Sequence, residues 1–188
     1  KSSNSASMCS FPVEVIPNGV DFKCFFPRDK ATVRRELGLN TGETIVLFGS
    51  CPERSEKNFK LANAALERIG LNRNVIFLCK IEKVHVPLYI NAADIVLLSS
   101  LWEGSPNIIK EAMACEVPVV STRVGDVPML FEGCSNCFIA DHTVESLSSQ
   151  ILSAVNSNRD IEDTGGRSRL MTLSIDALSI SNRLLQVY

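Results

Sequence analysis

Five short apolar runs, each followed by a polar loop, constrain the fold of this chain most strongly. They are Thr44–Phe48, Asn74–Cys79, Ile95–Leu98, Val117–Ser121 and Cys137–Ala140. Continuous apolar runs of this length are typical of strands buried on both faces of a parallel sheet. Segments with helical apolar spacing separate them, as in βαβ units. The alternation predicts an α/β fold: a doubly wound, mostly parallel, Rossmann-like sheet with helices on both faces.

Capping and spacing signals place the helices around these strands. Asp29 is a candidate N-cap for a helix through about Leu37, which Gly38 would end. Residues 1–12 form a lead-in or linker, and 13–188 form one domain. Other helices are expected at Phe59–Ile69, Pro87–Ala93, Val127–Phe131, Asp160–Met171 and Ser174–Tyr188, with one more ending at Val155 after a cap at Asp141 or Thr143; Val13–Ile16 is a short strand candidate.

Composition excludes several classes of protein. Of the 188 residues 45% are hydrophobic, which is enough for a core, and the net charge of −2 offers no basic face for nucleic acid. No apolar run approaches the roughly 20 residues that span a bilayer. Lys1–Ser10 lacks the apolar centre of a signal peptide, and because residue 1 is not Met we expect a fragment of a longer chain.

The cysteines indicate reduced thiols rather than a disulfide framework. There are seven, an odd number, and they are scattered through apolar contexts. This usage favours a cytoplasmic protein. Cys134 and Cys137 form a lone C-x-x-C, with His142 close by but no fourth ligand evident, so a turn between elements is favoured over a metal or redox site.

The stretch from Glu103 to Asp126 carries the main functional signal. Ser105 is a candidate N-cap and Pro106 suits the first helical turn, so a helix begins just after Glu103. Its apolar stripe would be Ile108, Ile109, Ala112 and Met113, with Asn107, Lys110 and Glu111 on another face. The free N–H groups at the helix mouth favour an anion, and Glu103 and Glu111 can accept hydroxyl hydrogen bonds. The combination suits a sugar nucleotide.

Several loops should form one functional rim, because ligands of doubly wound sheets bind outside the carboxyl ends of the strands. These loops are Gly49–Asn58, Lys80–His85, Ser99–Asn107 and Thr122–Asp126. Lys57 could reach a diphosphate as a point charge, and Arg54 could do so bidentately. The alternative is a solvated loop whose charges largely cancel. Glu103 and Glu111 could likewise be ordinary surface carboxylates.

Other chemistries lack their signatures. The loop after Phe48 has neither the G-x-G-x-x-G of dinucleotide-binding folds nor a P-loop lysine pattern. A flavodoxin-like or response-regulator-like domain would fit the fold, but the acidic cluster of that family after the first strand is missing. His85 and His142 are isolated and are interpreted as solvated or structural imidazoles.

At these residues the sequence resembles the retaining GT-B glycosyltransferases, in particular family 4 (glycosyltransferases group 1), and the match is to their C-terminal, donor-binding half. The hallmark is E-G-x-P-N-x-x-x-E-A-M-A-C-x-x-P-V-V, here Glu103 to Val120, with the E-x7-E pair of the family. Val15–Asp21, Glu56-Lys57-Asn58, Ala92-Ala-Asp94 and Gly125 also match, so the resemblance covers roughly residues 13–155.

The resemblance implies a role for each matching position. Glu111 would accept hydrogen bonds from the ribose hydroxyls, and Glu103 would hold hydroxyls of the donor sugar. Lys57 would neutralise the diphosphate leaving group, where charge develops in an oxocarbenium-like transition state. No metal or other cofactor is expected, and the base would lie near the loop after Cys79. Further substrate-binding positions are Gly49, Arg54 and the backbone of Gly104, Ser105, Pro106, Asn107 and Ile108.

Three positions depart from the family pattern. Ser50 stands where arginine commonly follows the first glycine, which puts phosphate stabilisation in question unless Arg54 substitutes. Glu116 stands where glycine is common, so the helix C-cap is expected to differ. Met129 stands where an acidic residue is frequent.

The resemblance also implies a missing half. An N-terminal Rossmann-like domain would bind the acceptor, a sugar, glycan or glycolipid, and the full-length protein could contact the inner face of the membrane peripherally. We therefore expect these residues alone to bind a nucleotide or nucleotide sugar weakly, without turnover. Two readings stay open: the donor half of a retaining hexosyltransferase in polysaccharide or glycolipid synthesis, or a degenerate nucleotide-binding or interaction module without catalysis. Base, sugar and acceptor are not determined.

Overall fold

The computed structural model describes residues 16–40, 42–156 and 165–187, and it confirms the predicted fold class. One five-stranded sheet, in which every strand pair is parallel, has the order β2-β1-β3-β4-β5. The strands are β1 (Thr44–Phe48), β2 (Arg73–Phe77), β3 (Ile95–Leu98), β4 (Val119–Thr122) and β5 (Cys137–Ala140). The order reverses between β1 and β3, which therefore form the switch point where such folds bind ligands.

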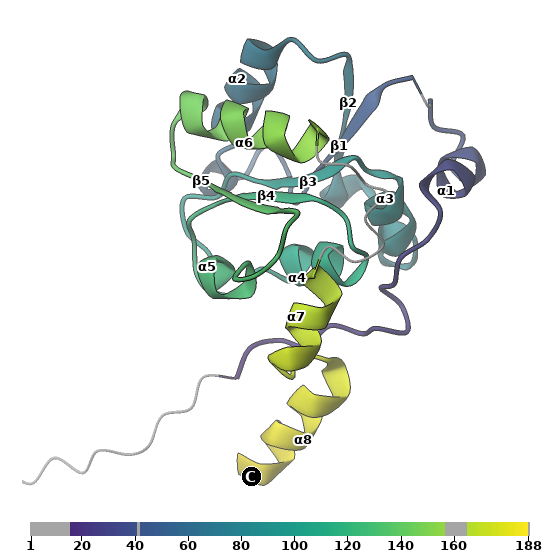
Figure 1. Cartoon of the computed structure of the whole chain (residues 1–188), viewed down its shortest axis with the longest axis vertical. Coiled ribbons are helices and arrows are strands. Elements are labelled where there is room, and N and C mark those ends of the chain that lie inside the picture. Colours follow the sequence, from purple (N-terminus) through teal and green to yellow (C-terminus); the bar gives the residue numbers. More distant parts are fainter. Residues whose placement is uncertain (1–15, 41, 157–164, 188) are drawn as a thin grey trace, which may run out of the picture.

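Helices cover both faces of the sheet, as Figure 1 shows. Val46 and Phe48 of β1 pack toward α2 and α6, whereas Ile45 and Leu47 pack toward α3 and α4. This alternation follows from the two-residue period of a strand. The helices are α1 (Lys30–Glu36), α2 (Phe59–Ile69), α3 (Val86–Ala92), α4 (Asn107–Ala114), α5 (Val127–Leu130), α6 (Val144–Asn156), α7 (Gly166–Thr172) and α8 (Ala177–Val187).

Most predicted elements lie within a few residues of the observed ones. The Asp29 carboxylate accepts from the backbone N–H of Thr32 at 2.7 Å, which confirms the cap of α1. β2 ends at Phe77 rather than Cys79, because Leu78–Lys80 turns into a 3-10 helix. In the described residues α7 begins at Gly166, and α8 begins at Ala177, three residues after the predicted start at Ser174. Most of the strand candidate Val13–Ile16 and residues 160–164 of the predicted helix lie outside the described residues.

The C-terminal helices are tied back to the domain by backbone pairing. Val20 exchanges hydrogen bonds with Ile175 and Ala177, each at 2.9 Å, just before α8. A Cβ on Gly19 would lie 2.8 Å from the Cα of Ala177, so this close approach requires glycine. Helix α8 then extends away from the sheet, beyond α7 (Figure 1).

The turn that follows α4 contains a residue that is unusual for its conformation. Glu116 has φ of +55°, in the left-handed region where glycine is favoured. Its carboxylate accepts from the backbone N–H of Arg167 at 2.8 Å. The Arg167 guanidinium also donates to the Ala114 and Phe25 carbonyls and lies over the ring of Phe22. The glutamate side chain thus compensates for backbone strain by joining α4 to α7.

Asp94 is the electrostatic centre of the edge where β1 and β3 begin. Its carboxylate accepts from Lys30 at 2.8 Å, from Arg34 at 2.6 Å and from the backbone N–H of Ile45 at 2.7 Å. Burial raises the pKa of Asp94, but these three hydrogen bonds outweigh it and the net shift is downward. Arg34 is itself buried, so it depends on this partner.

We predict that Asp94→Asn lowers the free energy of unfolding by about 3 kcal/mol at pH 7, because it leaves the buried Arg34 without a countercharge. The folded-state pKa lies below the unfolded value of about 3.9, so the contribution is complete above about pH 4 and is lost as the pH falls through the folded pKa. Urea denaturation at pH 7 and pH 3 measures the free energy of unfolding of both proteins. The difference between wild type and Asp94→Asn should be smaller at pH 3 than at pH 7. An equal difference at both pH values would contradict the prediction. Glu36→Gln, in an exposed pair with Arg28, is the control and should cost less than about 1 kcal/mol.

Candidate functional site

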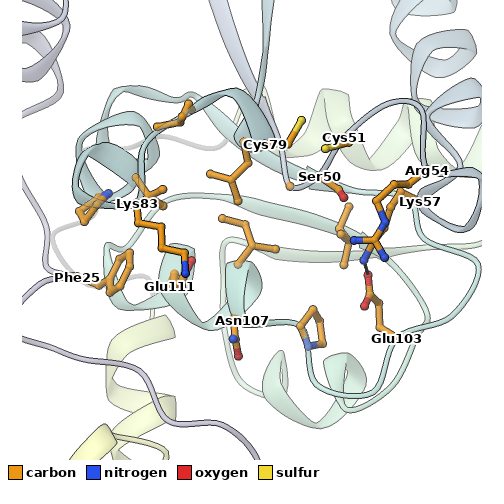
Figure 2. Close-up of a pocket in the computed structure, with 18 of the residues that line it drawn as sticks. Phe25, Ser50, Cys51, Arg54, Lys57, Cys79, Lys83, Glu103, Asn107 and Glu111 are labelled. Atoms are coloured by element: carbon orange, nitrogen blue, oxygen red, sulfur yellow. Dashed lines mark hydrogen bonds and ion pairs between the residues drawn. The ribbon is translucent and has the colours of Figure 1, made fainter.

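A pocket of about 930 Å³ opens at the carboxyl ends of β1, β2 and β3. Its position at the switch point of the sheet agrees with the rim predicted from the loops. Figure 2 shows Lys57 and Glu103 together at one side and Glu111 at the other. Of the predicted site residues only Gly104 does not line this pocket. Those that line it are Gly49, Arg54, Lys57, Glu103, Ser105, Pro106, Asn107, Ile108 and Glu111.

Lys57 and Glu103 form an ion pair that the sequence did not predict. The Lys57 ammonium donates to Oε1 of Glu103 at 2.5 Å, and the Ser100 hydroxyl donates to the same oxygen at 2.8 Å. The two charged side chains are only 13% and 15% exposed, so the pair is largely shielded from water. An anion that enters the pocket must therefore compete with a carboxylate for this lysine.

The turn that carries Lys57 is fixed from the neighbouring strand. Ser55–Lys57 is a 3-10 helix, and Asn58 ends it with φ of +50°. The hydroxyl of Ser99, which follows β3, donates to the carbonyls of Lys57 and Asn58 at 2.9 and 3.0 Å. The loops after β1 and β3 are thus joined by hydrogen bonds from the Ser99 side chain to the backbone as well as by the Lys57–Glu103 ion pair.

Arg54 lies beside this pair but is paired elsewhere. Its guanidinium contacts the Glu56 carboxylate at 2.5 Å, and its side chain is 57% exposed. Ser50, where the sequence pattern led us to look for arginine, is buried and lines the pocket. Both cationic side chains on the side of the pocket near β1 are therefore in ion pairs, Lys57 with Glu103 and Arg54 with Glu56.

The mouth of α4 differs from the prediction in its cap. Pro106 occupies the N-cap position, not the first helical turn, and no side chain caps the helix. The predicted cap, Ser105, instead donates its hydroxyl to Asp126 at 2.5 Å. The backbone N–H of Ile109 donates to the Pro106 carbonyl at 3.2 Å, while no side chain caps the N–H groups of Asn107 and Ile108, which can meet an anion.

Lys110 lies inside the protein, although it is not part of the apolar stripe of α4. The residue is 1% exposed, and its ammonium donates to the Asn18 carbonyl at 2.7 Å and to the Ser105 hydroxyl at 3.0 Å. Burial lowers its pKa, while the charges of Asp126 and Glu111 act in the opposite direction. A buried lysine thus holds the loop before α4 from beneath, whereas the stripe of Ile108, Ile109, Ala112 and Met113 is buried as predicted.

Glu111 faces the pocket as a carboxylate that is short of donors. Burial raises its pKa, and only the charge of Lys110 opposes that shift. Among the described residues, no side chain or backbone group donates a hydrogen bond to it. A partly buried carboxylate in this state is suited to accept two hydroxyl groups from a ligand.

The loop after β4 supports the Glu103–Asn107 loop by direct backbone contact. The backbone N–H of Asp126 donates to the Gly104 carbonyl at 3.0 Å. Gly125 has φ of +50°, and a Cβ there would overlap the Gly104 carbonyl and lie 2.7 Å from the Glu103 carbonyl oxygen. Only glycine permits this approach. Met129, in the position noted from the sequence, is 45% exposed on α5.

None of the cysteines that the structure describes is in a disulfide. Cys51 and Cys79 line the pocket, and Cys134 and Cys137 lie close together near the start of β5. Across the described ranges, no group of three or more His, Cys, Asp and Glu side chains is placed to hold a metal ion. No helix in those ranges is long and apolar enough to cross a membrane.

Comparison with known proteins relates this chain to one family. The family profile described as "Glycosyl transferases group 1" matches residues 26–157. The D-inositol 3-phosphate glycosyltransferase of Mycobacterium sp. strain KMS is 27% identical over 161 residues, which cover 70% of this chain and 37% of that protein. The chain thus spans little more than a third of the length of this curated relative.

Solved structures share the fold at low sequence identity. Anabaena HepE, crystallised with UDP and glucose, has a TM-score of 0.72 at 20% identity, over 93% of this chain and 56% of that one. The C-terminal domain of a glycosyl transferase group 1 family protein (LpcC) from Francisella tularensis has a TM-score of 0.65 at 19% identity. That match covers 82% of this chain and 97% of the domain.

We predict that Gly125→Ala destabilises the protein by roughly 2–5 kcal/mol, because it adds left-handed strain and a backbone overlap under the Glu103 loop. Gly133→Ala is the matched control. Gly133 also has a positive φ, of +80°, but a Cβ there would meet no described atom within 4 Å, so only about 1 kcal/mol of strain is expected. Urea denaturation of both variants measures the difference. If both variants lose the same free energy of unfolding, the close contact between Gly125 and the Gly104 carbonyl does not account for the loss, and the prediction is contradicted.

Proposed function

This chain belongs to the glycosyl transferases group 1 family, and on that premise we propose that it is the C-terminal, donor-binding half of a retaining family 4 glycosyltransferase. The full-length protein would transfer a hexose from a nucleoside diphosphate sugar to a sugar or lipid-linked acceptor. The observation that carries the proposal is that one pocket at the switch point contains Lys57 and both glutamates of the E-x7-E pair.

The two ends of the pocket suit the two ends of such a donor. Glu111, with its unsatisfied carboxylate, would accept the ribose hydroxyls, and Glu103 would hold hydroxyls of the sugar. Between them lie the N-terminal N–H groups of α4, which favour the diphosphate. HepE, which shares this fold, was crystallised with UDP and glucose, and this supports a nucleotide sugar as the ligand class.

Lys57 would act on the leaving group. As the bond between sugar and phosphate lengthens, negative charge grows on the departing diphosphate oxygen, and a nearby ammonium stabilises it. In the structure that ammonium is bonded to Glu103. When the donor binds, the Lys57 ammonium would therefore be shared between the diphosphate and Glu103. The hydroxyl groups of the sugar would then donate new hydrogen bonds to Glu103. We propose that this chemistry needs no metal ion.

The acceptor would bind to a separate N-terminal domain of the full-length protein, at the inner face of the membrane where the acceptor is a glycolipid. We therefore propose that the 188 residues bind a nucleotide but do not transfer sugar alone. A second candidate, a nucleotide-binding or interaction module without catalysis, is favoured by one observation. Ser50 replaces the arginine of the family pattern, and Arg54 is paired with Glu56 rather than directed to a free anion site.

We predict that Glu111→Ala weakens nucleoside diphosphate binding about ten- to hundredfold, because it removes a charged acceptor of two hydroxyl hydrogen bonds. Calorimetric titrations with UDP, GDP and ADP measure this and identify the base. Glu145→Ala, an exposed glutamate on α6 across the sheet, is the control and should bind like wild type. Unchanged binding in Glu111→Ala would contradict the role of Glu111, and no binding of any nucleotide by the wild type would favour the interaction module.

A further inference from the structure

Two cysteines from different loops meet at the wall of the pocket. Cys51 follows β1 and Cys79 follows β2, and these strands are parallel neighbours in which Phe48 pairs with Phe77. Cys51 therefore lies three residues after Phe48, and Cys79 lies two residues after its partner Phe77. Both line the pocket, and Figure 2 shows their sulfur atoms next to each other at its edge.

The two thiols are in contact and accessible. The neighbouring Cys51 thiol is the main cause that raises the pKa of Cys79, followed by burial and by the charges of Cys51 and Glu53. Both cysteines are free; Cys79 is exposed and Cys51 is half-buried. Small reagents in solution can therefore reach a pair of thiols that are already adjacent.

We propose that Cys51 and Cys79 are an oxidisable thiol pair, which hydrogen peroxide converts into a disulfide across the β1 and β2 loops. We further propose that this crosslink weakens nucleotide binding; this second part rests on the proposed function of the pocket.

The oxidation balances in two steps. The Cys51 sulfur, as the thiolate, attacks one peroxide oxygen, the O–O bond breaks, and the other oxygen leaves as water after protonation. The Cys79 sulfur then attacks the sulfenic sulfur of Cys51, and its thiol proton leaves with the hydroxyl as a second water. In total, two thiols and one peroxide give one disulfide and two waters. A dithiol such as dithiothreitol reverses the reaction by exchange.

The crosslink would act on the loops that shape the pocket. Cys51 belongs to the loop that leads to Lys57, and Cys79 to the 3-10 helix that leads to the Lys83 side of the pocket. A disulfide has an S–S bond of about 2.05 Å, which is shorter than any contact between two thiols. The two side chains, and the loops to the extent that they follow, must therefore shift at a wall that the nucleotide would otherwise use.

A second thiol pair in the same chain provides an internal comparison. The neighbouring Cys134 thiol and burial raise the pKa of Cys137 well above the ordinary value. The Cys134 thiol contacts the Leu130 and Gly165 carbonyls rather than the pocket. We expect this pair to react more slowly than Cys51 and Cys79, because thiol reactivity follows exposure and thiolate character.

Stepwise peroxide treatment, alkylation of the remaining thiols and peptide mass spectrometry test the first part. The Cys51–Cys79 disulfide should form first, disappear with dithiothreitol, and be lost in Cys51→Ser and Cys79→Ser but not in Cys134→Ser. Earlier formation of a Cys134–Cys137 disulfide, or overoxidation of Cys51 or Cys79 without a crosslink, would overturn it.

Calorimetry with UDP before and after oxidation tests the second part. We expect at least fivefold weaker binding by the oxidised wild type, and in Cys51→Ser, which lacks the thiol that reacts with peroxide, we expect the same binding before and after treatment. A crosslinked protein that binds UDP as tightly as the reduced one would overturn the effect on binding. If the reduced protein binds no nucleotide, the proposed function and this second part fail together, while the mass-spectrometric result still decides the first.

Discussion

The ion pair between Lys57 and Glu103 joins the two loops that leave the sheet at its switch point, and the geometry of the pocket depends on it. One partner follows β1 and the other follows β3, which are adjacent parallel strands. Parallel pairing brings the ends of both strands to one edge, and the hydroxyls of Ser99 and Ser100 fix the backbone and the carboxylate there. Without a ligand, the pocket keeps its main cation neutralised, which avoids a shielded, unpaired charge.

A buried polar layer beneath the pocket supports the same edge. Lys110 contacts Asn18 and Ser105, Ser105 contacts Asp126, and the backbone of Asp126 holds the Gly104 carbonyl. These contacts join the start of the domain, the loop before α4 and the loop after β4. Because the Lys110 ammonium has two hydrogen-bond acceptors, the lysine can be buried at tolerable cost, and the mouth of α4 is held in place for an anion.

Sequence reasoning predicted the parts of this structure that depend on local pattern. Apolar runs located the strands, and the parallel-sheet rule placed the predicted site residues on one rim. Sequence reasoning could not predict which polar groups pair, because partners such as Lys57 and Glu103 are far apart in sequence. The burial of Lys110 was not predicted, because its two hydrogen-bond acceptors, the Asn18 carbonyl and the Ser105 hydroxyl, come from separate segments of the chain. The contact of Cys51 with Cys79 was missed for the same reason.

A crystal structure of the chain with bound UDP tests the central claim most directly. The account predicts the diphosphate at the mouth of α4, with the Lys57 ammonium bonded to a phosphate oxygen and the ribose hydroxyls bonded to Glu111. UDP bound elsewhere, or bound in the pocket while Lys57 remains bonded only to Glu103 and Glu111 contacts no ligand atom, would contradict it.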